Sequence, residues 1–228
     1  MVVMNRESLS ETLDAVKQAF FDGKVLTEVE RSRAANWIAG LQGKPRSYFG
    51  LFAPASNDRI GAVRVFSGEP INSSVGISHI LGEEACRALI LLNVKDPGVK
   101  AALNLATAGM LERLGQDETA GDVQGMYCCG ICSVAFWRHL AVGGLDRNEE
   151  RLTAGIRVLK SYRAGDARWR RFPFYYTLLA LNDMDLKPAI EEMRYAAPTL
   201  ERYLKRPRAK GEYSRRRRLL CEMILAKC

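Results

Sequence analysis

The feature that most constrains the fold is a unit that recurs four times along the chain. It consists of a helix, a loop with glycine and a bulky aromatic residue, and a second helix that opens on small or aromatic residues; its clearest copy spans residues 151–185. A recurrence of roughly 45 residues is typical of stacked helical hairpins, in which no single unit can bury its apolar face. The sequence therefore predicts an all-α fold of αα-hairpin repeats that form a small or partial α/α toroid.

We expect one domain over residues 1–228, because a chain of this length and 47% hydrophobic content can bury one sizeable core. Helical spacing predicts a first helix from Ser10 to Phe21 with Ser10 as its N-cap. The hairpins are expected to pair residues 27–41 with 77–94, 99–114 with 125–142, 147–163 with 172–183, and 187–204 with 213–226. The loop at residues 42–76 is unusually long, which is often a sign of function, and its segment VRVF is compatible with a short strand.

The expected compartment is the cytoplasm. No basic segment followed by an apolar one opens the chain, and no apolar stretch is long enough to cross a bilayer. Six cysteines without regular spacing, in a chain with its own core, indicate reduced thiols rather than a disulfide framework. No cofactor is predicted.

Basic character is confined to the C-terminal hairpin, residues 187–228. Residues 199–228 carry ten basic and three acidic residues, and so hold +7 of the net charge of +8. Four of the cations, Arg215, Arg216, Arg217 and Arg218, open a helix, where the helix dipole disfavours positive charge, so a negative group is expected nearby. Protein carboxylates on Glu191, Glu192 or Glu201 are one candidate partner; nucleic acid or an anionic lipid surface is the other.

Two segments resemble a known family. In VQGMYCCGICSVAFWRHLAVGGL and FPFYYTLLALNDM, the positions Gln124-Gly125, Cys132, Phe136-Trp137 and 175–177 resemble the inner helices of terpenoid cyclases and protein prenyltransferase β subunits. The resemblance covers roughly residues 77–185 and implies a ring of hairpins around an apolar funnel. It also implies that an inner-helix mouth binds an isoprenoid or a similar molecule.

The catalytic residues of that family are not matched. Gly130 and Tyr176 stand where the family has its aspartate and histidine zinc ligands, and Met126 where it has the arginine that holds the prenyl diphosphate. Catalytic zinc needs three protein ligands, and the Asp-x-Asp-Asp motif of class II cyclases is missing as well. The resemblance therefore implies the scaffold, and an enzyme of this type would lack the usual motifs.

If the second helix of each hairpin is an inner helix, the four N-termini face one mouth. Such N-termini carry unpaired N–H groups and suit an anion, and tyrosine supplies an apolar face with a polar tip. The predicted ligand-binding residues are Ser78, Tyr127, Cys128, Trp169, Tyr175, Tyr176, Tyr213 and Arg216. Aromatic core packing is the alternative interpretation of the same residues.

His79 and Glu83 are the candidate catalytic pair. The two residues share a helix face with Cys86, and this arrangement would suit a general acid–base pair or a partial metal site. The alternative is that His79 is a structural histidine at a helix N-terminus, hydrogen-bonded to the preceding loop. Helical spacing places Cys128 and Cys132 on one side of a helix and Cys129 on another side. Buried thiols in the helix are therefore favoured over a metal centre, and no metal is predicted. His139 is explained by the dipole at a helix C-terminus.

The sequence thus favours a protein that binds a small, largely apolar molecule, isoprenoid or anionic, at the inner-helix mouth. The alternative is a non-enzymatic scaffold that uses the basic hairpin to bind nucleic acid or an acidic partner.

Overall fold

The computed structural model describes residues 4–118, 123, 125–207 and 209–228, and the fold in these residues is all-α. Its helices are α1 (Leu9–Phe21), α2 (Glu28–Ala39), α3 (Ser74–Leu92), α4 (Pro97–Asp117), α5 (Gly130–Leu140), α6 (Asn148–Ser161), α7 (Phe174–Asp183), α8 (Lys187–Leu204) and α9 (Glu212–Lys227). The expected all-α class is confirmed. Gln124 and Arg208, which belong to the segments singled out above, lie outside the described residues.

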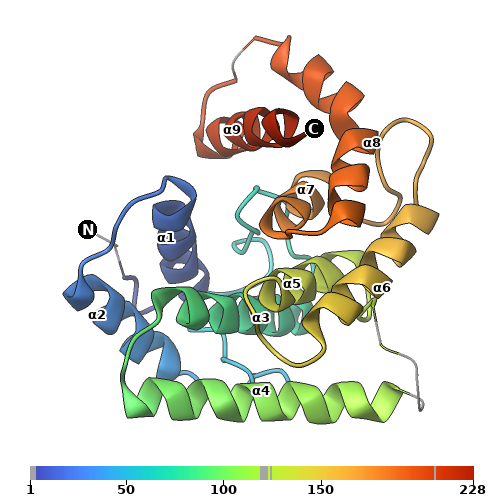
Figure 1. Ribbon diagram of the computed structural model, residues 1–228. Coiled ribbons are helices and arrows are strands. Elements are labelled where there is room, and N and C mark those ends of the chain that lie inside the picture. The colour runs from blue at the N-terminus through green and yellow to red at the C-terminus, as the bar shows by residue number, and fades with distance from the viewer. Residues whose placement is uncertain (1–3, 119–122, 124, 208) are drawn as a thin grey trace.

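Two of the four predicted hairpins are present, because α2 contacts α3 and α8 contacts α9. The predicted pairings of residues 99–114 with 125–142 and of 147–163 with 172–183 are wrong: in the described part of the chain α4 packs on α2 and α3 rather than on α5, and α6 packs on α5 and α8 rather than on α7. α3 contacts α5, α5 contacts α7 and α7 contacts α9, so the helices predicted as the second of each hairpin form a continuous row (Figure 1). α2 and α4 pack beside α3, α6 packs beside α5, and α8 packs beside α7. A contiguous core of buried apolar side chains runs through these helices. Closure of the row into a toroid stays a prediction.

The starts of α1 and α2 differ from the sequence prediction. α1 begins one residue earlier than expected, with Ser8 rather than Ser10 as N-cap. The buried carboxylate of Asp58, on the long loop, accepts hydrogen bonds from the N–H groups of Leu9 (2.8 Å) and Ser10 (3.1 Å). Thr27, expected inside a helix, is instead the N-cap of α2 and forms a capping box with Glu30.

α5 begins at Gly130, five residues later than expected. The carbonyl of Gly125 accepts a hydrogen bond from Trp137 Nε1 at 2.7 Å, and Gly125 also packs against the backbone of Gly155 on α6. These contacts hold residues 125–129 as a non-helical lead-in to the helix. That lead-in is what places Tyr127, Cys128 and Cys129 outside α5.

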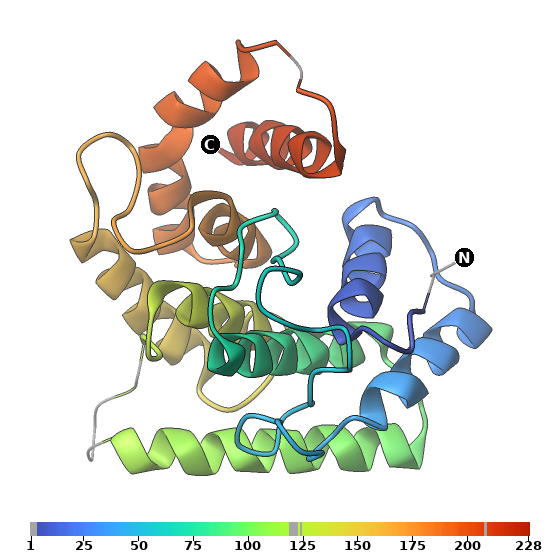
Figure 2. The ribbon, with the colours of Figure 1, turned by 180° about the vertical axis from the view of Figure 1, so that it is seen from behind.

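The loop between α2 and α3 crosses the middle of the molecule between α1, α7 and α9 (Figure 2). Within it an isolated bridge joins Arg64 to Pro70, and the described residues of the segment VRVF form no strand. Val63, Val65 and Phe66 are buried, so this loop is part of the core. No helix in the described part of the chain is long and apolar enough to span a membrane.

Candidate functional site

The strongest candidate site lies where the N-terminal part of α3 meets the start of α5. His79, on α3, is 1% exposed, and its ring stacks on Tyr48 of the long loop with centroids 4.3 Å apart. The ring of Tyr127 meets His79 edge-on at 4.6 Å, and the hydroxyls of Tyr48 and Tyr127 are hydrogen-bonded at 2.8 Å. Two aromatic residues therefore fix the plane of the imidazole.

Glu83 joins two histidines inside the core. Its Oε1 lies 3.3 Å from Nε2 of His79, one helical turn away, and its Oε2 lies 2.6 Å from Nδ1 of His139 on α5. Burial alone raises the pKa of Glu83, but the hydrogen bonds with His139 and His79 outweigh burial and hold the pKa at about 2. The carboxylate is thus an ionised acceptor that orients the His79 ring. The structure brings together the predicted pair His79 and Glu83.

Two thiols lie close to the His79 ring. An imidazole nitrogen of His79 and the Sγ atoms of Cys128 and Cys132 all lie within 4.8 Å of one another. Nε2 is held by Glu83, whereas Nδ1 is buried and has no hydrogen-bond partner among the described residues. Nδ1 is therefore the nitrogen that the arrangement leaves available. We call His79, Cys128 and Cys132 the thiol–imidazole cluster.

Cys129 belongs to the same neighbourhood, which corrects the expectation that it points elsewhere. It is the N-cap of α5 and precedes the helix, so helical spacing does not apply to it. Hydrogen bonds with Cys128 and Cys132 lower the pKa of the Cys129 thiol, and hydrogen bonds with Cys128 and Cys129 raise that of Cys132. Cys128 and Cys129 are also exposed. The explanation of all three as buried helix thiols is therefore wrong for two of them.

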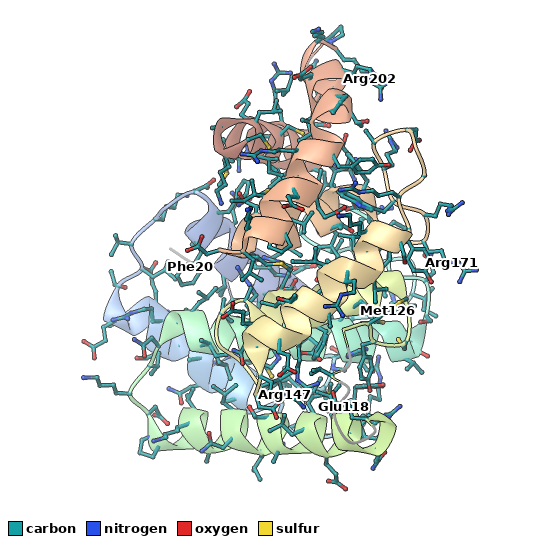
Figure 3. The ribbon with its side chains drawn as sticks, turned by 45° about the vertical axis from the view of Figure 1, so that its right-hand side comes forward. Phe20, Glu118, Met126, Arg147, Arg171 and Arg202 are labelled. Carbon is teal, nitrogen blue, oxygen red and sulfur yellow. The ribbon has the colours of Figure 1, made fainter. Side chains whose placement is uncertain are left out.

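The backbone around the thiols is tightly fixed. Ser133 Oγ accepts a hydrogen bond from the Tyr127 N–H at 2.8 Å and lies 2.8 Å from the carbonyl oxygens of Tyr127 and Cys129. A Cβ on Gly130 would lie 2.1 Å from the carbonyl oxygen of Arg171, so only glycine fits there. The side chain of Arg171 projects outward from the α6–α7 loop (Figure 3). The start of α5 is thus held from within and by the neighbouring loop.

A second buried network lies one residue further along α3. Glu84 Oε1 accepts hydrogen bonds from Arg138 Nη1 and from the hydroxyl of Tyr176, both at 2.5 Å, and Lys17 Nζ lies 3.6 Å from Oε2. Arg138 also donates to Asp183 at 2.8 Å. Burial raises the pKa of Glu84, but the cations around it outweigh burial and hold the pKa at about 2. This network joins α1, α3, α5 and α7.

The other predicted mouth residues have partners within the chain. Tyr176 is fully buried, and its N–H and that of Tyr175 bind the carboxylate of Glu69 at 3.2 and 3.0 Å. The anion expected at the N-terminus of α7 is therefore Glu69 of the long loop. Trp169 is buried and its Nε1 donates to Glu192 at 2.9 Å. Core packing explains Tyr176 and Trp169 better than ligand contact does.

The remaining mouth residues lie apart from these. Ser78 is half-buried beside His79. Tyr213, which packs on Gly68, and Arg216 line a polar cleft of about 550 Å³ between α1 and α9. Tyr127 and Cys128 belong with His79, so the structure divides the expected mouth into separate places.

The four consecutive arginines bind other parts of the chain. Arg216 is 2% exposed and forms a two-pronged ion pair with Asp14 on α1, with the shorter distance 2.6 Å. The others follow the same pattern: Arg215 with Asp22, Arg217 with the Ser67 carbonyl and Glu69, and Arg218 with the Leu204 carbonyl and Glu222. The carboxylate interpretation is therefore favoured, although the partners are not Glu191, Glu192 or Glu201. Contact with nucleic acid stays a prediction without support from these arginines.

Comparison with known proteins does not identify the chain. No family model, curated protein or solved structure matches it. The resemblance to terpenoid cyclases and prenyltransferase β subunits stays a prediction. A functional argument therefore depends on the geometry of the site.

Sequence reasoning found the members of the thiol–imidazole cluster but not their grouping. It placed His79 with Glu83 and Cys86, all on one helix, because only intrahelical spacing can be read from a sequence. The signal that could have joined His79 to Cys128 is the prediction that the N-termini of the second helices meet. Tyr48, which lies in the long loop, carried no such signal.

Proposed function

We propose that this protein binds a divalent transition metal of the zinc type through Nδ1 of His79 and the thiolates of Cys128 and Cys132. Imidazole and thiolate are the ligands that zinc prefers, and the two thiolates favour it over magnesium or calcium. The single observation that carries the proposal is the convergence of three such ligand atoms within 4.8 Å. Nδ1 of His79, which is buried and has no hydrogen-bond partner in the described part of the chain, supports it independently.

The surroundings of His79 are those of a metal ligand. In metal sites a ligating histidine commonly gives its second ring nitrogen to a carboxylate, which fixes the tautomer and the orientation of the ring. Glu83 is placed to do this at Nε2, and His139 holds Glu83 from its other oxygen. With Nε2–H donated to Glu83, Nδ1 keeps its lone pair for the metal.

A site with three protein ligands leaves one tetrahedral position for a small molecule, as in catalytic rather than structural zinc sites. Because Cys128 is exposed, the position is accessible from solvent. We infer that this position is where a small ligand binds. In this proposal the ligand expected at the mouth binds near the N-terminal parts of α3 and α5. The rings of Tyr48 and Tyr127 line the apolar side of this site.

Titration with Co²⁺ under reducing conditions tests the proposal, because tetrahedral cobalt with thiolate ligands has a characteristic visible and near-ultraviolet spectrum. We expect one equivalent to produce this spectrum in the wild type, zinc to displace it, and His79→Gln and Cys132→Ser each to weaken binding at least about tenfold. Cys228→Ser, which removes an exposed thiol at the C-terminus, is the control. An unchanged spectrum in Cys132→Ser, or a titration without a stoichiometric end point, would refute the site.

A further inference from the structure

A cleft of about 520 Å³ lies where the C-terminal turn of α8 meets the first turns of α9, at the top of the view in Figure 1. Three arginines line it, Arg206, Arg215 and Arg218, and among the described residues they face one carboxylate, that of Glu222. We call it the arginine cleft. It shares no residue with the thiol–imidazole cluster. An excess of positive charge in a concave surface raises the local concentration of anions.

The chain compensates the charges of these arginines only weakly. Arg206 is exposed and forms no ion pair or side-chain hydrogen bond among the described residues. Arg215 is 54% exposed, and its Nη1 lies 3.5 Å from the carboxylate of Asp22. Nε of Arg218 is buried, lies 3.4 Å from the carboxylate of Glu222 and has no hydrogen-bond partner in the described part of the chain. Because exposed ion pairs are weak, the negative group expected near these arginines is only partly supplied by the chain itself.

The arginine cleft also offers hydroxyl groups and apolar surface. Tyr203 and Ser214 line it, and neither hydroxyl has a hydrogen-bond partner among the described residues. Pro207 and Leu219 line it as well and supply apolar side chains. A molecule in the cleft would therefore meet charged donors, neutral donors and apolar carbon together.

A phosphate group matches this set of donors better than a carboxylate does. The guanidinium fork fits the oxygens of both groups. A phosphate monoester, however, carries a charge of about −1.5 to −2 at pH 7 and three strong acceptor oxygens, whereas a carboxylate has one charge and two oxygens. Three guanidinium groups and two hydroxyls supply more donors than two oxygens can use. The apolar side chains suit an organic substituent on the phosphate.

We propose that the arginine cleft binds a small organic phosphate monoester, with the three arginines around the phosphate and the organic group against Pro207 and Leu219. Three cations in one cleft match a single phosphate, whereas a nucleic-acid strand needs a series of cations along its backbone. Arg216 and Arg217, which lie between two of the cleft arginines in the sequence, bind Asp14 and the Ser67 carbonyl instead.

Isothermal titration calorimetry of the full chain with phenyl phosphate tests the proposal. We expect one site per chain, and a dissociation constant that rises at least about tenfold in Arg206→Gln, because hydrogen bonds to charged groups are lost. Arg206 has no ion pair in the described part of the chain, so this variant should keep the circular dichroism spectrum of the wild type.

Arg171→Gln is the matched control. It removes the same charge from a side chain that projects outward from the α6–α7 loop (Figure 3), and it should leave the dissociation constant unchanged. Cys132→Ser should also bind phenyl phosphate as the wild type does, because the arginine cleft does not depend on the proposed metal site. Benzoate, the matched carboxylate, and inorganic phosphate, which has no organic group, should each bind more weakly than phenyl phosphate.

The absence of binding up to millimolar phenyl phosphate, or equal weakening in Arg206→Gln and Arg171→Gln, would overturn the site. Equal affinity for benzoate would overturn the choice of phosphate, and equal affinity for inorganic phosphate would overturn the role of the apolar side chains. A single-stranded oligonucleotide that binds more tightly than phenyl phosphate, and that both substitutions weaken alike, would assign this surface to nucleic acid instead.

Discussion

Tyr176→Phe removes one hydroxyl from the interior and tests whether this residue is structural. Tyr176 is fully buried, and its hydroxyl donates to the ionised carboxylate of Glu84 at 2.5 Å. A hydrogen bond to a charged group contributes about 1.5–3 kcal/mol to stability. The ring is kept, so packing is unchanged. We expect the free energy of unfolding to fall by about 1.5–3 kcal/mol, which for a domain of this size lowers Tm by roughly 3–12 °C.

Urea denaturation followed by circular dichroism measures the change. Tyr175→Phe is the matched control, because Tyr175 is the preceding residue, is half-buried and shows no hydroxyl hydrogen bond among the described residues. It should change stability by less than about 0.5 kcal/mol. Equal losses in the two variants, or a loss below about 0.5 kcal/mol in Tyr176→Phe, would refute the structural assignment and return Tyr176 to the ligand-binding candidates.

Three further predictions concern the stability of the fold. Glu84 has a pKa of about 2 in the folded protein, against 4.5 ordinarily. It therefore contributes stability above pH 4.5, and up to about 3 kcal/mol of this is lost as the pH falls toward 2. Urea denaturation at pH 7, 4 and 3 should show the fall in the free energy of unfolding, and a flat profile would contradict it. Gly155→Ala places a Cβ 2.4 Å from Trp137 Nε1 and should cost about 2–4 kcal/mol in urea denaturation, whereas a neutral result would show that the helices can separate freely. Arg216→Met breaks a largely buried ion pair and should lower the free energy of unfolding by about 2–4 kcal/mol. Arg215→Met, which breaks an ion pair of an exposed arginine, should lower it by less than about 1 kcal/mol. Similar values for the two variants would be inconsistent with the burial of Arg216.

The sequence predicted the helices because their signals are local. Apolar spacing and proline positions placed α8 at its observed bounds and α7 within two residues. The starts of α1 and α5 were missed because their determinants are distant: Asp58 caps α1, and Trp137 holds the carbonyl of Gly125. A residue about 50 positions away leaves no periodic signal at the helix that it caps.

The site was predicted in part for the same reason. Intrahelical spacing joined His79 to Glu83, and the structure shows that contact. The contact of Glu83 with His139 and the approach of Cys128 to His79 depend on how α3 packs against α5. The long loop supplies both Tyr48 at the site and Glu69 at α7, and neither role is encoded near those residues.

The most direct test of the metal site is native mass spectrometry of freshly reduced protein mixed with a small excess of Zn²⁺. The account predicts that the wild type retains one zinc ion per chain, that Cys228→Ser retains one as well, and that Cys132→Ser retains none. A wild type that keeps no zinc, or a Cys132→Ser variant that keeps its zinc, would contradict the assignment of His79, Cys128 and Cys132 as metal ligands.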